Sequence, residues 1–255
     1  MRSTFDQDIT AVAAARWAAA GDARLAEIMP TLVRHLHDFA REVEMNHHRD
    51  PGATPATVLG PFHIEGSPTL HYGANMADGI SGLPLYITGV VRQLSGRTVD
   101  GAVLDVWQAD AHGIYEGQLD DAAARLRGKY TSQAGGAYCV QTIAPLGYSI
   151  PMDGPVGELI SRTDVSHFRP AHVHFLITAP GYEPLITHLF EKGAPYLDAD
   201  AVFGTKPELV VEFERRRPGP TPDGGTSDVP WLHAQYDFVL QPTRAATQPM
   251  KVIGR

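Results

Sequence analysis

The segment Arg169-Pro170-Ala171-His172-Val173-His174-Phe175 sets two histidines one residue apart within an apolar, strand-forming run. In a β-strand, side chains at positions i and i+2 leave the same face, about 7 Å apart along the backbone. His172 and His174 can therefore converge on one metal ion, whereas adjacent histidines would point to opposite faces. The alternative is that both histidines lie on a solvated strand face without a ligand. Other parts of the chain decide between these interpretations.

Length and composition narrow the class of protein. The 255 residues, 43% of them hydrophobic, suffice for one large domain or for one domain with an appendage. The formal net charge of −8 disfavours nucleic-acid binding, which needs a basic face. No run approaches the roughly 20 apolar residues of a membrane span, and Arg16 interrupts an Ala-rich N-terminal run that would otherwise suggest a signal peptide. The single cysteine, Cys139, excludes an intrachain disulfide, so we expect a cytoplasmic protein with Cys139 in its core.

The chain changes character near residue 50. Between residues 8 and 49, apolar residues recur at three- and four-residue steps, which is typical of amphipathic helices. Gly21-Asp22 supplies a stop followed by a cap, so two helices are predicted, with Pro30 kinking or restarting the second. We therefore divide the chain into a helical segment and connector, residues 1–54, with a role in oligomerisation or as a lid, and a β-sandwich domain, residues 55–255.

Beyond the connector, runs of β-branched and aromatic residues alternate with turns that contain glycine or proline. The predicted strands are Leu85–Val91, Val103–Trp107, Lys129–Thr131, Ala137–Ile143, His172–Thr178, Leu185–Phe190, Leu209–Phe213 and Tyr236–Leu240. Several short strands with frequent turns predict a mainly β protein with a β-sandwich. The segments 147–170 and 215–230 are predicted to be loops from their glycine, proline and aspartate content.

Further metal ligands have to come from outside the H-x-H segment. No glutamate follows His174 within a few residues, as a cupin-type site would require, and one cysteine cannot build a zinc site of thiolates. Tyr115 and Tyr148 both follow predicted strands in turn-rich segments, where functional side chains tend to lie. A trivalent cation stabilises a phenolate, although a free phenol has a pKa of about 10, so these tyrosines favour Fe(III). Alternatively, each tyrosine is a packed ring with a hydrogen-bonded hydroxyl.

Seven segments, in this order along the chain, resemble the intradiol ring-cleavage dioxygenases, and within that family the branch that cleaves hydroxyquinol. They are Thr57–Phe62, Leu104–Ala109, Gly113–Tyr115, Leu126–Tyr130, Ile150–Gly157, Arg169–Phe175 and Pro195–Gly204. The resemblance covers about residues 55–213, with a weaker match at Phe39–Val43. It implies a β-sandwich catalytic domain that acts on a small aromatic diol or triol with O2.

The resemblance also implies which side chains carry the reaction. One Fe(III) per chain would be held by Tyr115, Tyr148, His172 and His174. Binding of the substrate would displace Tyr148, which would then take up a substrate proton as a base. Arg169 would stabilise electron density on the substrate during the attack of oxygen, because a guanidinium keeps its proton.

Other histidines have less defined roles. His188 stands where catechol-type relatives carry a polar residue near the iron, so it could orient a ligand or a proton chain, and a strand histidine without such a role is the alternative. His112 and the pair His47-His48 are expected at the surface.

By the same resemblance, the substrate lies between two walls, made of Val58, Gly60, Pro61 and Phe62 on one side and of Ala201 and Val202 on the other. Ala201 and Val202 replace a bulkier Phe-Ala pair of catechol-cleaving relatives, which leaves room for one more ring substituent. We therefore expect hydroxyquinol (benzene-1,2,4-triol) to be cleaved to 3-hydroxy-cis,cis-muconate, the enol form of maleylacetate. Catechol or another substituted catechol is the alternative substrate.

The chain departs from the family in its helical region. Only residues 44–56 join Phe39–Val43 to Thr57–Phe62, whereas relatives have a longer helical stretch that covers the substrate. We expect a more open active site, and we expect the helical dimer interface of the relatives, with its lipid-binding tunnel, to be altered or absent. The expected assembly is still a homodimer. A non-catalytic, transthyretin-like β-sandwich that binds a ligand is the hypothesis from another class. A zinc hydrolase is disfavoured because no activating glutamate lies near the H-x-H.

Overall fold

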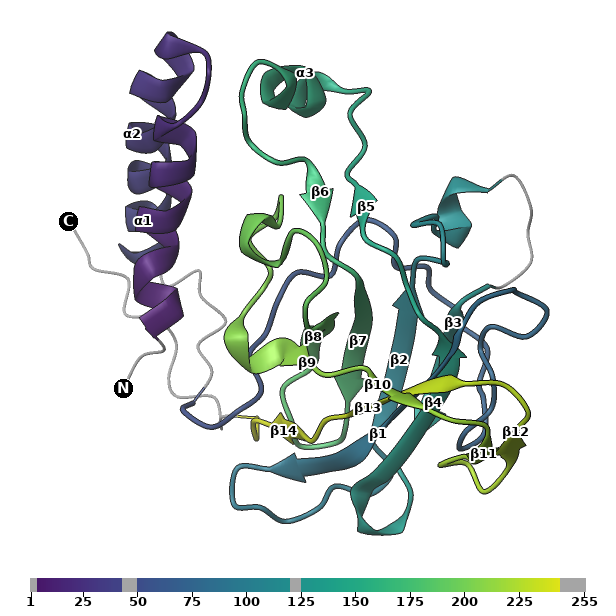
Figure 1. Ribbon diagram of the computed structural model, residues 1–255. Helices are drawn as coiled ribbons and strands as arrows, with labels where there is room; N and C mark the ends of the chain where they lie inside the picture. The colour runs from purple at the N-terminus through teal and green to yellow at the C-terminus, as the bar shows by residue number, and fades with distance from the viewer. Residues whose placement is uncertain (1–3, 43–49, 120–124, 244–255) are drawn as a thin grey trace.

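The computed structural model describes residues 4–42, 50–119 and 125–243, and the predicted surface pair His47-His48 lies outside these ranges. Figure 1 shows two N-terminal helices packed side by side and standing next to a β-sandwich. The helices are α1 (Thr4–Ala18), α2 (Ala23–Glu42) and, above the sandwich in this view, the short α3 (Pro155–Ser161). Short 3-10 turns are η1 (Glu116–Gln118), η2 (Ala134–Gly136), η3 (Leu197–Ala199) and η4 (Pro207–Leu209).

The boundary between the first two helices lies where the sequence predicts it. Oδ1 of Asp22 accepts hydrogen bonds from the backbone N–H groups of Arg24 at 2.9 Å and Leu25 at 3.0 Å, which caps the start of α2. Helix α2 then runs through Pro30 as one element, so of the two predicted effects of Pro30, a kink or a restart, the restart is wrong. A proline inside a helix costs about 3 kcal/mol, and packing along α1 offsets this cost.

The sandwich consists of two five-stranded sheets. The strands of the first sheet are β1 (Pro84–Gln93), β4 (Ala137–Ile143), β10 (Glu214–Arg216), β13 (Trp231–Gln235) and β14 (Phe238–Leu240). The second sheet has the order β3-β2-β7-β8-β9, with the strands β2 (Val103–Gln108), β3 (Arg127–Thr131), β7 (His172–Thr178), β8 (Leu185–Glu191) and β9 (Val210–Val211). The predicted mainly β fold is confirmed, and β4 and β7 have the bounds that the sequence predicts.

Strand β7 decides where the site lies, because its side chains alternate between two environments. Val173, Phe175 and Ile177 are fully buried in the core between the sheets, together with Leu85 and Ile87 of β1. Successive side chains of a strand point to opposite faces, so His172 and His174 lie on the outer face of the second sheet. Cys139 is buried as predicted, next to Tyr86 and Trp231.

Two segments predicted as loops contain short regular elements. Residues 147–170 include β5 (Tyr148–Ser149), α3 and β6 (Phe168–Arg169), and residues 215–230 include β11 (Gly219–Pro220) and β12 (Thr226–Ser227). The predictions missed them because two-residue strands have no periodicity, while α3 is a seven-residue helix that starts with a proline at its first position. Strand β13 was also missed, whereas the predicted strands at 209–213 and 236–240 are shorter than expected.

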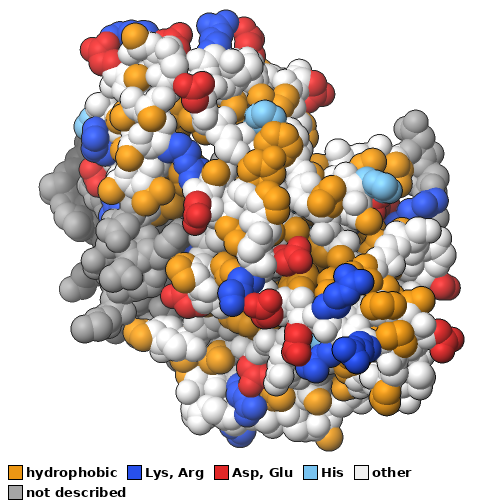
Figure 2. Space-filling model, in the orientation of Figure 1, with side chains coloured by type: hydrophobic (Ala, Val, Ile, Leu, Met, Phe, Trp, Pro, Cys, Tyr) orange, Lys and Arg blue, Asp and Glu red, His pale blue; other side chains and the backbone are white. Residues whose placement is uncertain are grey.

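The surface mixes charges of both signs. On the face shown in Figure 2, Lys and Arg side chains are interspersed with Asp and Glu side chains, and hydrophobic side chains lie between them. Among the described residues, none of the helices has both the length and the apolar composition needed to cross a bilayer.

Candidate metal centre

His172 and His174 form the centre of a buried polar cluster on the outer face of the second sheet. Their Nε2 atoms are 3.1 Å apart, and the two residues are 2% and 1% exposed. Trp107 of β2 pairs with His174 in the strand register, and its ring stacks on the imidazole with centroids 4.6 Å apart. The strand geometry places both rings on one face, and the stacking fixes the ring of His174.

The hydrogen bonds of His172 assign its tautomer. Its Nδ1 lies 2.7 Å from the carbonyl oxygen of Pro170, to which it donates, so Nε2 keeps a lone pair. That lone pair faces Nη1 of Arg169 at 3.2 Å. For His174, Nδ1 is buried without a hydrogen-bond partner among the described residues. Metal-binding histidines commonly donate their second ring N–H to a backbone carbonyl, and His172 has this arrangement.

Tyr115 brings its hydroxyl to the same point. Its oxygen lies 3.1 Å from Nε2 of His174 and 3.4 Å from Nε2 of His172. The side-chain Oε1 of Gln118 accepts the backbone N–H of Tyr115 at 2.9 Å, which holds the turn that begins η1. Phe62 stacks on the Tyr115 ring with centroids 4.3 Å apart, so the phenol is packed between an aromatic ring and the histidines.

Tyr148 completes the cluster from β5. Its ring centroid lies 5.1 Å from that of Tyr115 and 5.7 Å from that of His172. Strand β5 pairs with β6 so that Tyr148 lies opposite Arg169. The four residues that the sequence suggested as ligands therefore come together in one place, from three separate stretches of the chain.

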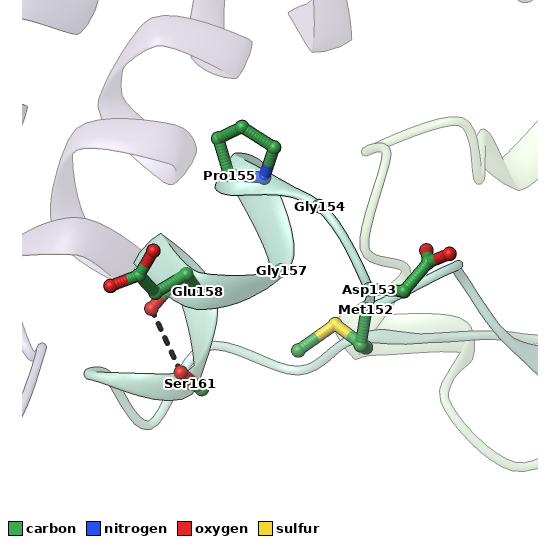
Figure 3. A pocket seen from close by; sticks show the side chains of 7 residues that line it. All are labelled: Met152, Asp153, Gly154, Pro155, Gly157, Glu158 and Ser161. Atoms are coloured by element: carbon green, nitrogen blue, oxygen red, sulfur yellow. Dashed lines mark hydrogen bonds between the residues drawn. The ribbon is translucent and has the colours of Figure 1, made fainter.

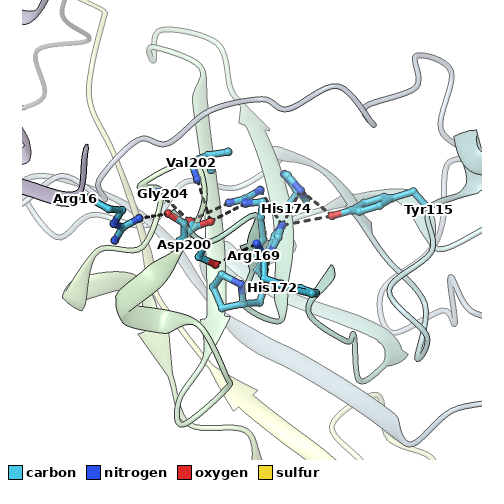
Figure 4. A network of polar contacts seen from close by, with 11 residues as sticks. Arg16, Tyr115, Arg169, His172, His174, Asp200, Val202 and Gly204 are labelled. Atoms are coloured by element: carbon cyan, nitrogen blue, oxygen red, sulfur yellow. Dashed lines mark hydrogen bonds and ion pairs between the residues drawn. The ribbon is translucent and has the colours of Figure 1, made fainter. Parts of the chain in front are cut away.

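Arg169 is held next to the histidines by a buried ion pair. Its Nε lies 3.0 Å from Oδ1 of Asp200 and its Nη2 lies 3.4 Å from Oδ2, with both residues 2% exposed (Figure 4). Burial acts to lower the pKa of the guanidinium, but the charge and hydrogen bonds of Asp200, helped by Tyr148, outweigh it and raise that pKa. The cluster thus contains a permanent positive charge. The sequence predictions missed Asp200, although it lies within one of the resembling segments.

His188 of β8 adds a third imidazole. It lies directly opposite His174 in the strand register, with ring centroids 4.2 Å apart, and it is completely buried. One ligand atom from each of His172, His174 and His188 lies within 4.8 Å of the others. Neither nitrogen of His188 makes a well-formed hydrogen bond among the described residues. The backbone of Val58 nevertheless lies close enough to favour the protonated ring.

Burial sets the protonation states in the cluster. It lowers the pKa of His172, His174 and His188 well below the usual value, and the positive charge of Arg169 adds to this effect. All three imidazoles are therefore neutral at neutral pH, the form in which histidine binds metals. Burial and Tyr148 raise the pKa of Tyr115 well above 10, and a bound cation reverses this preference because it stabilises the phenolate.

The residues expected to line the substrate lie around this cluster. Gly60 lies so close to His174 that an added Cβ would be 3.4 Å from its Cε1 atom, and Phe62 covers Tyr115. Val202 is 37% exposed, and its backbone N–H points to Oδ1 of Asp200 at 3.4 Å. Val58, Pro61 and Ala201 are at least partly exposed. Gly60 and Phe62 of one predicted wall thus touch the donors, and Val202 of the other is linked to the cluster through Asp200.

A shallow surface pocket lies elsewhere, around α3 (Figure 3). Its lining residues are Met152, Asp153, Gly154, Pro155, Gly157, Glu158 and Ser161. They include no histidine, tyrosine or arginine, and Ser161 donates to the backbone oxygen of Glu158 at 2.8 Å. Among the described residues, the group of histidines that could hold a metal ion is His172, His174 and His188, which lies outside this pocket.

These observations define a class. A β-sandwich that presents three neutral imidazoles on one sheet face, with two phenols and a guanidinium from neighbouring segments beside them, is a protein equipped to hold a metal ion next to an anionic ligand. Comparison with known proteins is consistent with this class. The family model described as Dioxygenase matches residues 58–242, and the chain belongs to this family, among the intradiol ring-cleavage dioxygenases.

Individual relatives cover almost the whole chain. A 6-chlorohydroxyquinol 1,2-dioxygenase of Cupriavidus pinatubonensis is 38% identical over 94% of this chain and 99% of its own length. A hydroxyquinol 1,2-dioxygenase of Nocardioides simplex is 36% identical over 93% of this chain and 96% of its own length. The crystal structure of hydroxyquinol 1,2-dioxygenase from Pseudomonas putida DLL-E4 matches with a TM-score of 0.74 at 38% identity, covering 94% of this chain and 99% of that one. The Cupriavidus alignment spans 283 positions, more than the 255 residues here, so that relative has segments that this chain lacks.

Proposed function

We propose that this protein is an Fe(III)-dependent dioxygenase that cleaves hydroxyquinol between its two adjacent hydroxyl-bearing carbons and incorporates both atoms of O2. The observation that carries the proposal is the convergence of Tyr115, His172 and His174 to within 3.4 Å, next to Arg169. The relatives that cover nearly the whole chain are named for hydroxyquinol or 6-chlorohydroxyquinol, which supports this substrate.

The donor set fits a trivalent iron. Two phenols and two imidazoles become two phenolates and two neutral donors when they bind, which leaves about one positive charge for a dianionic catecholate. Nε2 of His172 and Nε2 of His174 face each other at 3.1 Å, and neutral imidazole nitrogens that converge in this way suit a shared cation. When bound, the iron would hold the two adjacent oxygens of the substrate and prepare the ring for reaction with O2.

The side chains of the chain do the remaining work. We assign Tyr115, Tyr148, His172 and His174 as ligands, with Tyr148 the one that leaves when substrate binds and accepts its proton. Tyr148 suits this role because it is the most exposed of the four, at 8%. Arg169 would stabilise negative charge on the substrate, because Asp200 fixes it beside His172.

The first test is the visible spectrum of the purified protein, recorded before and after hydroxyquinol is added without oxygen. A tyrosinate bound to Fe(III) produces a charge-transfer band and a wine-red colour, and direct chelation of the substrate should shift this band. A protein that stays colourless after reconstitution with iron would refute the proposal and favour a β-sandwich that only binds a ligand.

Substrate choice needs a separate measurement. Catechol, hydroxyquinol, a chlorinated hydroxyquinol, pyrogallol and protocatechuate should be compared at matched concentrations by kcat/KM. We expect hydroxyquinol to lead catechol by roughly 10- to 200-fold, the range that one ring substituent in a shaped pocket is worth. A preference for catechol would assign the alternative substrate and leave the ring-cleavage chemistry unaffected.

We also propose that the protein is a cytoplasmic homodimer. Support for a dimer comes from α2, where Ile28, Leu32, Leu36 and Phe39 form a stripe on one face and are 40–56% exposed in the single chain. Light scattering coupled to size exclusion should report a dimer, and a Leu32→Glu variant should shift it to the monomer.

A further inference from the structure

The loop that follows β8 forms one side of the cluster and is held in a strained conformation. Tyr196 and Phe203 at its two ends have φ angles of 68° and 54°, a region that bulky residues rarely adopt. Such strain costs on the order of 1–3 kcal/mol for each residue and persists only where surrounding contacts fix the chain. This loop, residues 196–204, also contains Ala201 and Val202 of the proposed substrate wall, so its contacts determine the position of that wall.

Contacts on the inner side tie the loop to Arg169. The carboxylate of Asp200 pairs with the guanidinium of Arg169, and it also accepts the backbone N–H of Gly204 at 2.9 Å. The backbone N–H of Ala201 donates to the carbonyl oxygen of Phe168, the neighbour of Arg169, at 2.9 Å. An added Cβ at Gly204 would be only 3.1 Å from Nη2 of Arg169. The loop and Arg169 therefore form one closely fitted unit.

The outer side of the loop is held by a residue from the N-terminal helices. Arg16 of α1 donates from Nη1 to the backbone oxygen of Asp200 at 2.8 Å and from Nη2 to that of Asp198 at 3.0 Å. Its guanidinium also lies over the ring of the strained Phe203, 4.3 Å from the centroid. Figure 4 shows Arg16 and Arg169 reaching Asp200 from opposite sides. A planar guanidinium can donate both hydrogen bonds and stack on the ring at the same time. The ammonium group of a lysine has neither the pair of fixed N–H groups nor the planar surface that these contacts need.

We propose that Arg16 is a positioning residue for ring cleavage. It clamps loop 196–204 against the sandwich, and in this way it holds the wall formed by Ala201 and Val202 and, through Asp200, the guanidinium of Arg169. The inference rests on the function proposed above for the cluster. It gives the helical segment a direct part in substrate selection in addition to any part in oligomerisation.

The test compares Arg16→Met and Arg16→Lys with Arg24→Met as the matched control. Arg24 lies on α2, and its exposed side chain pairs with Glu27 at 2.6 Å, so Arg24→Met removes the same charge from the helical segment without touching the loop. For Arg16→Met we expect KM for hydroxyquinol, and the dissociation constant from anaerobic titration of the visible band, to rise at least about tenfold, the effect of losing hydrogen bonds to a charged group. The preference for hydroxyquinol over catechol should narrow, and Arg16→Lys should recover part of the loss.

Hydrogen exchange gives a readout that does not depend on turnover. The backbone N–H groups of Phe203 and Gly204, which bond to Asp200, should exchange faster in Arg16→Met than in Arg24→Met or the wild type. Iron content and the charge-transfer band of the substrate-free protein should stay the same in all variants, because Arg16 contacts none of the assigned ligands in the described structure.

Several outcomes would overturn the assignment. If KM and substrate preference are unchanged in Arg16→Met, the assignment is wrong, even if hydrogen exchange in loop 196–204 becomes faster. Arg16 would then hold the loop without any effect on substrate binding. Loss of iron together with a lower melting temperature, without rescue by lysine, would show a merely structural role. If the wild type cleaved none of the catechols, the proposed function would fail, and the loop exchange alone would decide whether Arg16 acts as the clamp.

Discussion

Tyr115, His172 and His174 bring three polar atoms to within 3.4 Å of one another at a buried point, where the nearby donors are the Tyr115 hydroxyl and Nη1 of Arg169. A buried polar group without a partner costs about 1–3 kcal/mol. In this cluster that cost falls on Nδ1 of His174 and on both nitrogens of His188. The convergence of neutral imidazoles, a phenol and a neighbouring arginine is the support for the metal and anion site proposed above.

The role of Tyr148 can be separated from metal binding. Tyr148→Phe removes a phenolate that we assign as both a displaceable ligand and a proton acceptor, but leaves Tyr115, His172 and His174. We expect iron to be largely retained and kcat to fall by about 10²–10⁴-fold, the usual contribution of a positioned base. Iron analysis and steady-state kinetics measure the two effects, and near-wild-type turnover would show that the assignment is wrong.

The buried histidines predict how the stability of the metal-free protein depends on pH. The pKa values of His172, His174 and His188 are lowered in the folded state, so below about pH 6.5 the unfolded chain binds more protons than the folded one. Stability is therefore fully present above pH 6.5 and is lost as the pH falls toward the lowered values, by up to about 1.4 kcal/mol per pH unit for each histidine.

Urea unfolding of the metal-free protein at pH 7.5 and at pH 5.5 measures this loss. His188→Leu should reduce the difference in free energy of unfolding between the two pH values by roughly a third, since one of three histidines no longer contributes. His112→Leu, at an exposed position, serves as the control and should leave the difference as it is. A stability that rises on acidification in this window would contradict the lowered pKa values.

At the scale of elements, the strand alternation of β7 separates structure from function. One face of this strand builds the core with Val173 and Phe175, and the other presents the two histidines. The partner strands β2 and β8 place Trp107 and His188 beside His174 through their registers. A shift of one residue in either pairing would turn these side chains to the wrong face, so the hydrophobic core also sets the geometry of the site.

The first sheet depends on one glycine of β1. Strands β13 and β14 pair with β1 in the same register, and the carbonyl oxygen of Tyr236 between them passes so close to Gly89 that an added Cβ would be 1.8 Å away. Gly89→Ala should therefore destabilise the protein by at least about 3 kcal/mol, because backbone has to move. In Gly117→Ala the nearest atom is 3.8 Å from the added Cβ, and we expect a change within about 1 kcal/mol. Denaturant unfolding compares the two, and equal stabilities would contradict the close approach.

At the scale of the whole molecule, the site draws on segments from all over the chain. The sheet supplies the histidines, the β5 and β6 pair supplies Tyr148 and Arg169, and the loop after β8 supplies Asp200. Helix α1 adds Arg16 from a separate part of the fold (Figure 1). A ligand held at this point links several elements, so its binding should stabilise the native state as a whole.

Metal removal tests this coupling. Binding to the folded state alone contributes about 2.7 kcal/mol at a ligand concentration 100 times the dissociation constant. For a chain of this size that corresponds to a melting temperature roughly 5–10 °C higher in the iron-loaded protein than after chelation. Differential scanning calorimetry before and after chelation, with re-addition of iron as the control, measures the shift. Identical melting temperatures would mean that the cluster binds no metal tightly.

The sequence by itself determined the features that depend on local pattern. Some features can be recognised from neighbouring residues, because side-chain alternation and helix capping act over a few residues. They are the alternation along β7, the cap at Asp22 and the change from helical to strand-like sequence near residue 50. The H-x-H segment and the two tyrosines alone left a solvated strand face and packed rings as alternatives, and the resemblance of seven ordered segments to one family is what favoured them as metal ligands. The sequence shows no local pattern from which the ring-stacking partners or the short strands β5 and β6 could be predicted.

Only the tertiary structure decided which distant groups meet. Asp200 pairs with Arg169, 31 positions away, and Arg16 reaches the same residue across 184 positions. His188 was a candidate for a role near the metal from its position in the sequence. It lies opposite His174 because of the register in which β7 and β8 pair. These contacts depend on how the two sheets bury their apolar faces and where the helices then pack. That burial is a property of the whole chain, so a local stretch of sequence carries no sign of it.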